Sequence, residues 1–129
     1  MQNKINKRLR LHRQQKLDLD RKVVELQSAF KTWNKVEELR HQAETSKLKR
    51  LLQQKPVPGE LVGKLSELNH EIDRIDITLK IAKTKQAINN NPPQVREMWR
   101  LLTQRLETEK QLKKQRLQLV QKALENART

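Results

Sequence analysis

Two clusters of basic side chains carry the most definite chemistry in this sequence, which is the binding of anions. One cluster precedes the first acidic residue of the chain, Asp18, and the other lies near the carboxyl end. Such clusters bind phosphate backbones because each neutralised phosphate releases condensed counterions. The predicted nucleic-acid-binding residues are Lys4, Lys7, Arg8, Arg10, Arg13, Lys16, Lys110, Lys113, Lys114 and Arg116.

Each cluster also has a simpler interpretation. The first could be a solvated tip that keeps the protein soluble, although six cations with no acid among them exceed that need. In the second, Lys110 repels Lys113 and Lys114 by a few tenths of a kcal/mol, because residues three and four apart share a helix face. An anionic partner would relieve this repulsion, but the neighbouring Glu107 and Glu109 can offset it as well.

Five acidic side chains lie between residues 60 and 76, and they do not form a convincing catalytic or metal site. Glu67 and His70 match the Glu-x-x-His spacing of carboxylate-bridged metal bundles, but that chemistry needs the motif twice and it occurs once. Charge pairing between helices is the expected role of these carboxylates. The chain has no cysteine and only two glycines, so thiolate ligands are excluded and a phosphate-cradling loop is hardly possible. We therefore expect no enzyme activity, no cofactor and no metal.

Aromatic residues are scarce, which argues against base stacking as a main mode of binding. Phe30 and Trp33 lie three residues apart among apolar positions, and we expect them to anchor a core. Trp99 stands between Arg96 and Arg100 and is the one aromatic side chain retained as a possible exposed contact.

The elements that position these residues are three long helices. Proline-containing breaks at 55–59 and 89–93 stop helix propagation, which predicts helices over about 4–54, 60–88 and 92–127. Asn91 is expected to cap the last helix, with Pro92 at its first position.

Apolar residues spaced alternately four and three apart form a seam, the pattern of a helix built to lie along another helix. The clearest seam is Leu61, Leu65, Leu68, Ile72, Ile75, Leu79 and Ala82. In the first helix the seam slips after Trp33 and continues through Val36, Leu39 or Arg40, Ala43, Leu48 and Leu51-Leu52. A break near Asp18 or Asp20 is also conceivable, because either residue could cap a helix.

These patterns predict an all-α protein, an antiparallel coiled-coil-like bundle of three long helices with a protruding basic helix. Helix 60–88 should fold back onto the second half of the first helix, because the connecting loop is short. The N-terminal arm (residues 1–22) would then have no partner within the chain, and the bundle would comprise residues 23–129.

Charge decides between the function classes. The net charge is +14; the arm holds eight basic and two acidic residues, whereas residues 56–91 are balanced. We expect a non-enzymatic nucleic-acid-binding accessory protein, DNA or RNA, located inside the cell in the cytoplasm, nucleoid or nucleus. The alternative is a coiled-coil adaptor or assembly factor that dimerises or docks on a protein through its N-terminal helix. Peripheral binding to anionic membranes is a weaker third option.

Overall fold

Three long helices make up the described chain. The structure is a computed structural model that describes residues 2–88 and 90–128. The helices are α1 (Gln2–Gln53), α2 (Pro58–Gln86) and α3 (Pro93–Arg128), and no strand occurs among the described residues. The predicted all-α class, with three helices packed together, is confirmed. Met1, Asn89 and Thr129, which fall in the predicted arm, second loop and bundle, lie outside the described residues.

Proline fixes where α2 and α3 begin. In each case the carbonyl of the residue before the first helical proline accepts a hydrogen bond from the amide of the third helical residue. Val57 accepts from Glu60, Pro92 accepts from Val95, and both hydrogen bonds measure 3.0 Å. Proline suits the first helical position because its missing amide hydrogen would be unpaired there anyway. The prediction of Pro92 at this position is wrong by one residue, and Pro92, not Asn91, precedes the helix.

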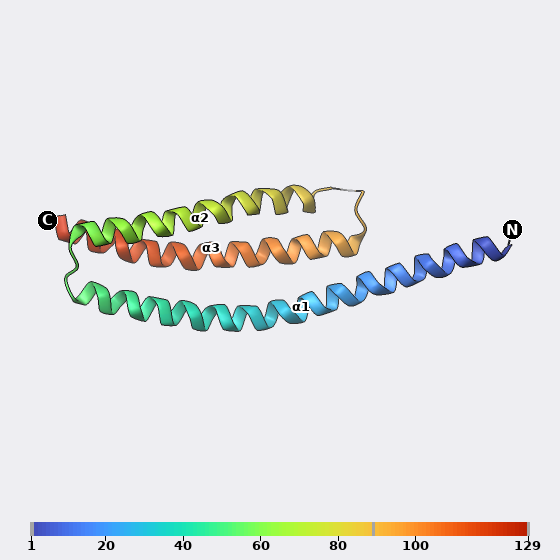
Figure 1. The fold of residues 1–129 in the computed structure, drawn as a ribbon, viewed down its shortest axis with the longest axis horizontal. Coiled ribbons are helices and arrows are strands. Elements are labelled where there is room, and N and C mark those ends of the chain that lie inside the picture. The colour runs from blue at the N-terminus through green and yellow to red at the C-terminus, as the bar shows by residue number, and fades with distance from the viewer. Residues whose placement is uncertain (1, 89, 129) are drawn as a thin grey trace.

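The middle layer of the fold is α3. Figure 1 shows α3 between α2 and α1, and α3 packs against both of them. The backbones of α1 and α2 do not approach each other closely anywhere in the described chain. The prediction that the second helix packs directly along the first is therefore wrong. A seam specifies that a helix has a partner but does not specify which helix the partner is.

The core lies mainly between α2 and α3. All seven residues of the α2 seam are buried or half-buried, and Leu61 and Val120 are almost completely enclosed, with 1% and 0% of their surfaces exposed. At the end nearest the first loop, Leu48 of α1 joins Leu61, Val120 and Leu124 in one apolar cluster. Burying each such side chain contributes about 1.5–3 kcal/mol relative to leaving it exposed.

Between Trp33 and Leu48, α1 faces α3 with polar residues. Glu37 is buried, and the half-buried His41 forms a hydrogen bond through Nε2 with Oε1 of Gln115, at 3.1 Å. Val36 and Leu39 point outward, with 48% and 65% of their surfaces exposed. The predicted seam is therefore wrong from Val36 to Ala43, whereas its later members are in the core: Leu48 is buried and Leu51 and Leu52 are half-buried. The residues that face α3 in this stretch keep their helical spacing. Because they are polar, a search for apolar periodicity does not detect them.

No break interrupts α1. The helix continues through Asp18 and Asp20 to Gln53, because nothing between residues 2 and 53 is glycine or proline. Lys55 then turns the chain with a backbone φ of 53°, in the left-handed region that favours glycine. One unbroken rod thus links the bundle to the N-terminal arm.

Candidate nucleic-acid interface

The N-terminal arm extends beyond the rest of the fold. Figure 1 shows the first part of α1 continuing past the ends of α2 and α3. Every side chain from residue 3 to residue 18 is exposed, and Leu19 is the first that is half-buried. Lysine, arginine, leucine and glutamine predominate here, and all are good helix formers, which favours helix even without a packing partner.

All six cations of the arm's cluster are exposed. They are Lys4, Lys7, Arg8, Arg10, Arg13 and Lys16. Among the residues whose side chains are described, none of the six takes part in an ion pair. The nearby carboxylates are engaged elsewhere, because Asp18 accepts a hydrogen bond from Gln14 and Asp20 accepts one from Gln94. The positive charge of the cluster therefore faces solvent.

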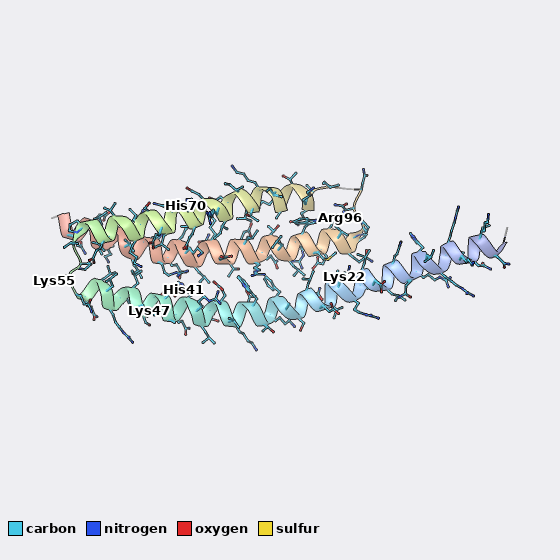
Figure 2. The ribbon with its side chains drawn as sticks, in the orientation of Figure 1. Lys22, His41, Lys47, Lys55, His70 and Arg96 are labelled. Carbon is cyan, nitrogen blue, oxygen red and sulfur yellow. The ribbon has the colours of Figure 1, made fainter. Side chains whose placement is uncertain are left out.

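Additional cations lie where the arm leaves the bundle. The hydrogen bond from Nε2 of Gln94 to Oδ1 of Asp20, at 2.9 Å, places the first turn of α3 beside this part of α1. Figure 2 shows Lys22 and Arg96 at this end of the bundle, and both are exposed. Lys22 and Arg96 do not belong to the site predicted from the sequence. The signal that could have included them is the pairing of α1 with α3, which brings residues 74 positions apart together.

The second predicted cluster lies at the contact between α2 and α3. Lys113 binds Glu71 with 2.7 Å between Nζ and Oε2, and Lys110 forms an ion pair with Asp76. The hydrogen bond from Lys110 is the main cause that lowers the pKa of Asp76. Their lysine side chains are mostly covered, with 24% exposed for Lys110 and 17% for Lys113. The structure thus uses these two charges to join helices.

The other two residues of that cluster are half-buried. Lys114 adds to the positive potential at Asp76, and Arg116 lies at the bottom of a groove. The structure therefore does not bring the two predicted clusters together. The first is on the arm, and the second is within the bundle, more than 90 residues further along the chain.

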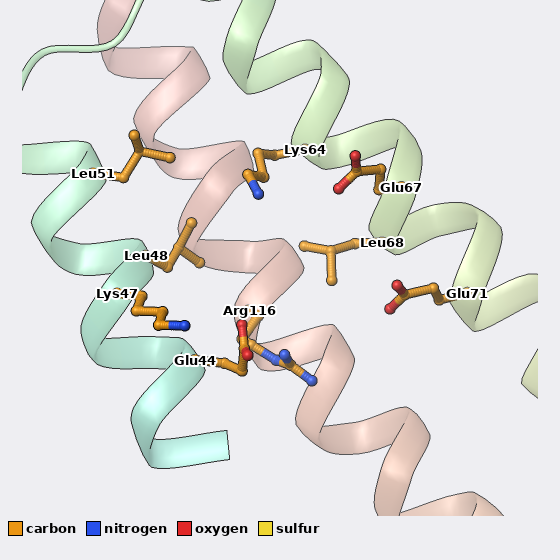
Figure 3. A pocket seen from close by; sticks show the side chains of 9 residues that line it. All are labelled: Glu44, Lys47, Leu48, Leu51, Lys64, Glu67, Leu68, Glu71 and Arg116. Atoms are coloured by element: carbon orange, nitrogen blue, oxygen red, sulfur yellow. The ribbon is translucent and has the colours of Figure 1, made fainter. Parts of the chain in front are cut away.

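The groove that contains Arg116 is a cavity of about 330 Å³ between α1 and α2, above α3. Figure 3 shows its walls, with Arg116 on α3 between the other two helices. Three basic and three acidic side chains line it, so it offers a polyanion no net attraction. The six are Lys47, Lys64, Arg116, Glu44, Glu67 and Glu71.

The aromatic residues help to join α1 to α3. The rings of Phe30 and Trp33 stack with their centroids 6.1 Å apart. The guanidinium of Arg105 lies over the Trp33 ring, 4.7 Å from its centroid, a cation–π contact between α3 and α1. Both rings are half-buried, as expected for core anchors, and Trp99 is half-buried too. None of the three is presented on the arm.

Among the residues that the structure describes, no arrangement would support a metal site. Glu67 and His70 are exposed on α2, and no three potential metal ligands converge anywhere in the described residues. In the same part of the chain, none of the helices combines the length and apolar character needed to cross a membrane. No protein-family model matches this sequence, and comparisons with curated proteins and with solved structures find no significant match.

Proposed function

We propose that this chain is a non-enzymatic nucleic-acid-binding accessory protein, an antiparallel coiled-coil-like bundle that carries a basic N-terminal helix. The arm extends away from the carboxylates of the bundle, and it contacts the phosphate backbone of the nucleic acid. Lys22 and Arg96 add contacts at its base. Lys110 and Lys113 are excluded from the binding surface because they serve the contact between α2 and α3.

One observation carries this proposal. Six exposed cations lie between residues 4 and 16 with no acidic residue among them, on a helix that extends beyond the bundle. At 1.5 Å per residue they span about 18 Å, a length over which B-DNA presents roughly ten phosphate charges. Every cation of the cluster thus has a phosphate within reach.

The proposal predicts the dependence of affinity on salt. Six phosphate contacts give a slope of about −5 for the logarithm of the binding constant against the logarithm of salt concentration. Affinity should fall about 10³-fold between 50 and 200 mM salt. Replacement of Arg8, Arg10 and Arg13 together by alanine should roughly halve that slope.

The experiment is fluorescence anisotropy with labelled polynucleotides at several salt concentrations. The matched control replaces Lys31, Lys35 and Lys49 with alanine, which removes the same charge from exposed positions of α1 within the bundle. We expect the arm variant to lose on the order of 100-fold in affinity at 0.1 M salt, and the control to lose little. Equal losses from the two variants would show that only net charge matters, and would overturn the proposal.

A second candidate, docking of the arm on a protein, is favoured by its apolar residues. Ile5 and Leu9 are 57% and 51% exposed and lie on the same side of α1 as the half-buried Leu19 and Val23. A helix that packs on α3 at one end could continue the same line of contacts on a partner. Light scattering tests the self-associating form: a salt-resistant dimer that is lost when Ile5 and Leu9 become serine would support it.

A further inference from the structure

From the distribution of charge around the arm we infer that its ligand is duplex DNA, with the arm lying in the major groove. This inference rests on the proposed function and names the class of nucleic acid that the arm fits. It is carried by three observations: the cations surround the helix, the arm is a single helix in width, and it carries no phenylalanine, tyrosine or tryptophan.

The cations lie on three sides of the arm. Successive residues of an α-helix are rotated by about 100°, so Lys4, Lys7 and Arg8 share one side. Arg10 and Arg13 share a second side, and Lys16 lies on a third. No sector wider than about 80° around the helix axis lacks a basic side chain. A ligand that uses all six must therefore present phosphates to more than one side of the helix.

A flat anionic surface does not meet that condition. A helix that lies on a membrane needs its apolar residues on one side and its cations on the other. In the arm, Leu9 and Leu11 point to opposite sides of the helix and are 51% and 63% exposed. A membrane would leave about half of the cations without a phosphate, whereas a groove bounded by two phosphate backbones presents phosphates to two sides of the helix.

The dimensions favour the major groove of B-DNA. An α-helix with its side chains is about 10–12 Å across, and this groove is about 12 Å wide. The exposed stretch from residue 3 to residue 18 is about 24 Å long, so it can lie in the groove while the three-helix bundle stays outside. The deep, narrow major groove of A-form RNA does not admit a helix.

Single strands are a poorer ligand for this surface. Proteins that bind single strands without sequence preference stack the bases on aromatic side chains. The first phenylalanine, tyrosine or tryptophan of the chain is Phe30, which is half-buried and stacked on Trp33 within the bundle. Trp33 is itself covered by Arg105. An extended strand would find cations on the arm, but His12 would be the one ring there on which a base could stack.

The test compares three ligands of one sequence: a 20-base-pair DNA duplex, the corresponding RNA duplex and the DNA single strand. We expect the intact chain to bind the DNA duplex at least tenfold more tightly than either of the others at the same salt concentration. Similar affinity for all three ligands, or tighter binding of the single strand, would overturn the inference of a groove-bound helix.

A helix-breaking variant that keeps every charge sharpens the test. Leu11 is 63% exposed, and proline in its place interrupts the arm helix without removing a cation. Leu11→Pro should abolish the preference for duplex DNA, and Leu11→Ala, the matched control, should retain it. If Leu11→Pro keeps the preference, the arm does not act as a groove-bound helix.

The two ideas fail in distinguishable ways. If the Arg8, Arg10 and Arg13 triple variant binds every polynucleotide as well as the intact chain does, the arm is not the binding surface and the proposed function fails. If that variant binds more weakly but the intact chain shows no preference for duplex DNA, the proposed function stands and only the inference about duplex DNA is overturned.

Discussion

The strongest test of the division of charge concerns Lys110 and Lys113, which the sequence grouped with the arm. The structure pairs them with Asp76 and Glu71 of α2. Their replacement should therefore weaken the fold and leave nucleic-acid binding nearly unchanged. Replacement of Arg8, Arg10 and Arg13 should have the opposite effects.

The magnitude follows from the exposure of the two pairs. The carboxylates are 38% and 49% exposed, so each pair contributes at the level of a surface ion pair, about 0.2–1 kcal/mol. The lysine stems are better covered, and alanine removes their packing as well. We expect Lys110→Ala with Lys113→Ala to cost about 1–2 kcal/mol in the free energy of unfolding.

That cost converts into a measurable melting shift. An unfolding entropy of about 2.1 cal/mol/K per residue gives about 0.27 kcal/mol/K for this chain of 129 residues. The double alanine variant should therefore lower Tm by about 4–7 °C, as followed by circular dichroism at 222 nm. Methionine at both positions keeps most of each stem, so it should cost less than alanine.

Added salt and a control variant separate the contribution of the ion pairs from that of net charge. In 1 M salt, screening should shrink the difference between the methionine variant and the intact chain, because the Debye length is then about 3 Å. Lys31→Met with Lys35→Met changes two exposed lysines of α1 that are in no ion pair and should shift Tm by less than about 2 °C. The reasoning is refuted if the methionine variant at Lys110 and Lys113 keeps its full Tm and loses as much DNA affinity as the arm variant.

Three further predictions concern the core, the first loop and pH. Leu61→Ala should cost about 2–5 kcal/mol because that side chain is 1% exposed, and Val62→Ala, at 46% exposed, should change Tm little in the same melts. Lys55→Gly should raise Tm by about 2–4 °C, because glycine adopts a φ of 53° without strain; a lowered Tm would contradict this. The pKa values of Asp76 and Glu97 are lowered chiefly by hydrogen bonds from basic side chains, so the stability gained is complete above their unfolded pKa values and is lost as pH falls through the folded ones. Tm should therefore be flat from pH 8 to pH 5 and fall below about pH 4, and Asp76→Asn should reduce that fall.

The extent of the helices follows from local chemistry, and the sequence predicted it to within two residues at each end. Pro58 and Pro93 determine where helices begin, and the absence of glycine and proline between residues 2 and 53 allows a single rod. The seam of α2 is also local information, since apolar spacing alone indicates which side of that helix is buried.

The partner of each helix did not follow from the sequence. The contact between α1 and α3 includes the buried Glu37 and the hydrogen bond of His41 to Gln115, and polar residues give no apolar signal. Val36 and Leu39 gave such a signal and yet are exposed. Periodicity identifies apolar stripes on each helix. Which stripe is buried depends on how helices far apart in the sequence pair, and therefore on the whole bundle.

The basic clusters show why position matters more than the number of cations. The stretch of α3 from 109 to 116 holds a single apolar residue, the half-buried Leu112, and the ion pairs of Lys110 and Lys113 with α2 lie on either side of it. Another such pair, between Lys83 and Glu107, follows along the same contact. Acidic side chains thus face lysines at three places along the contact between α2 and α3. The arm has no such counterpart in the part of the chain that the structure describes, which is why we propose that its charge serves a ligand rather than the fold.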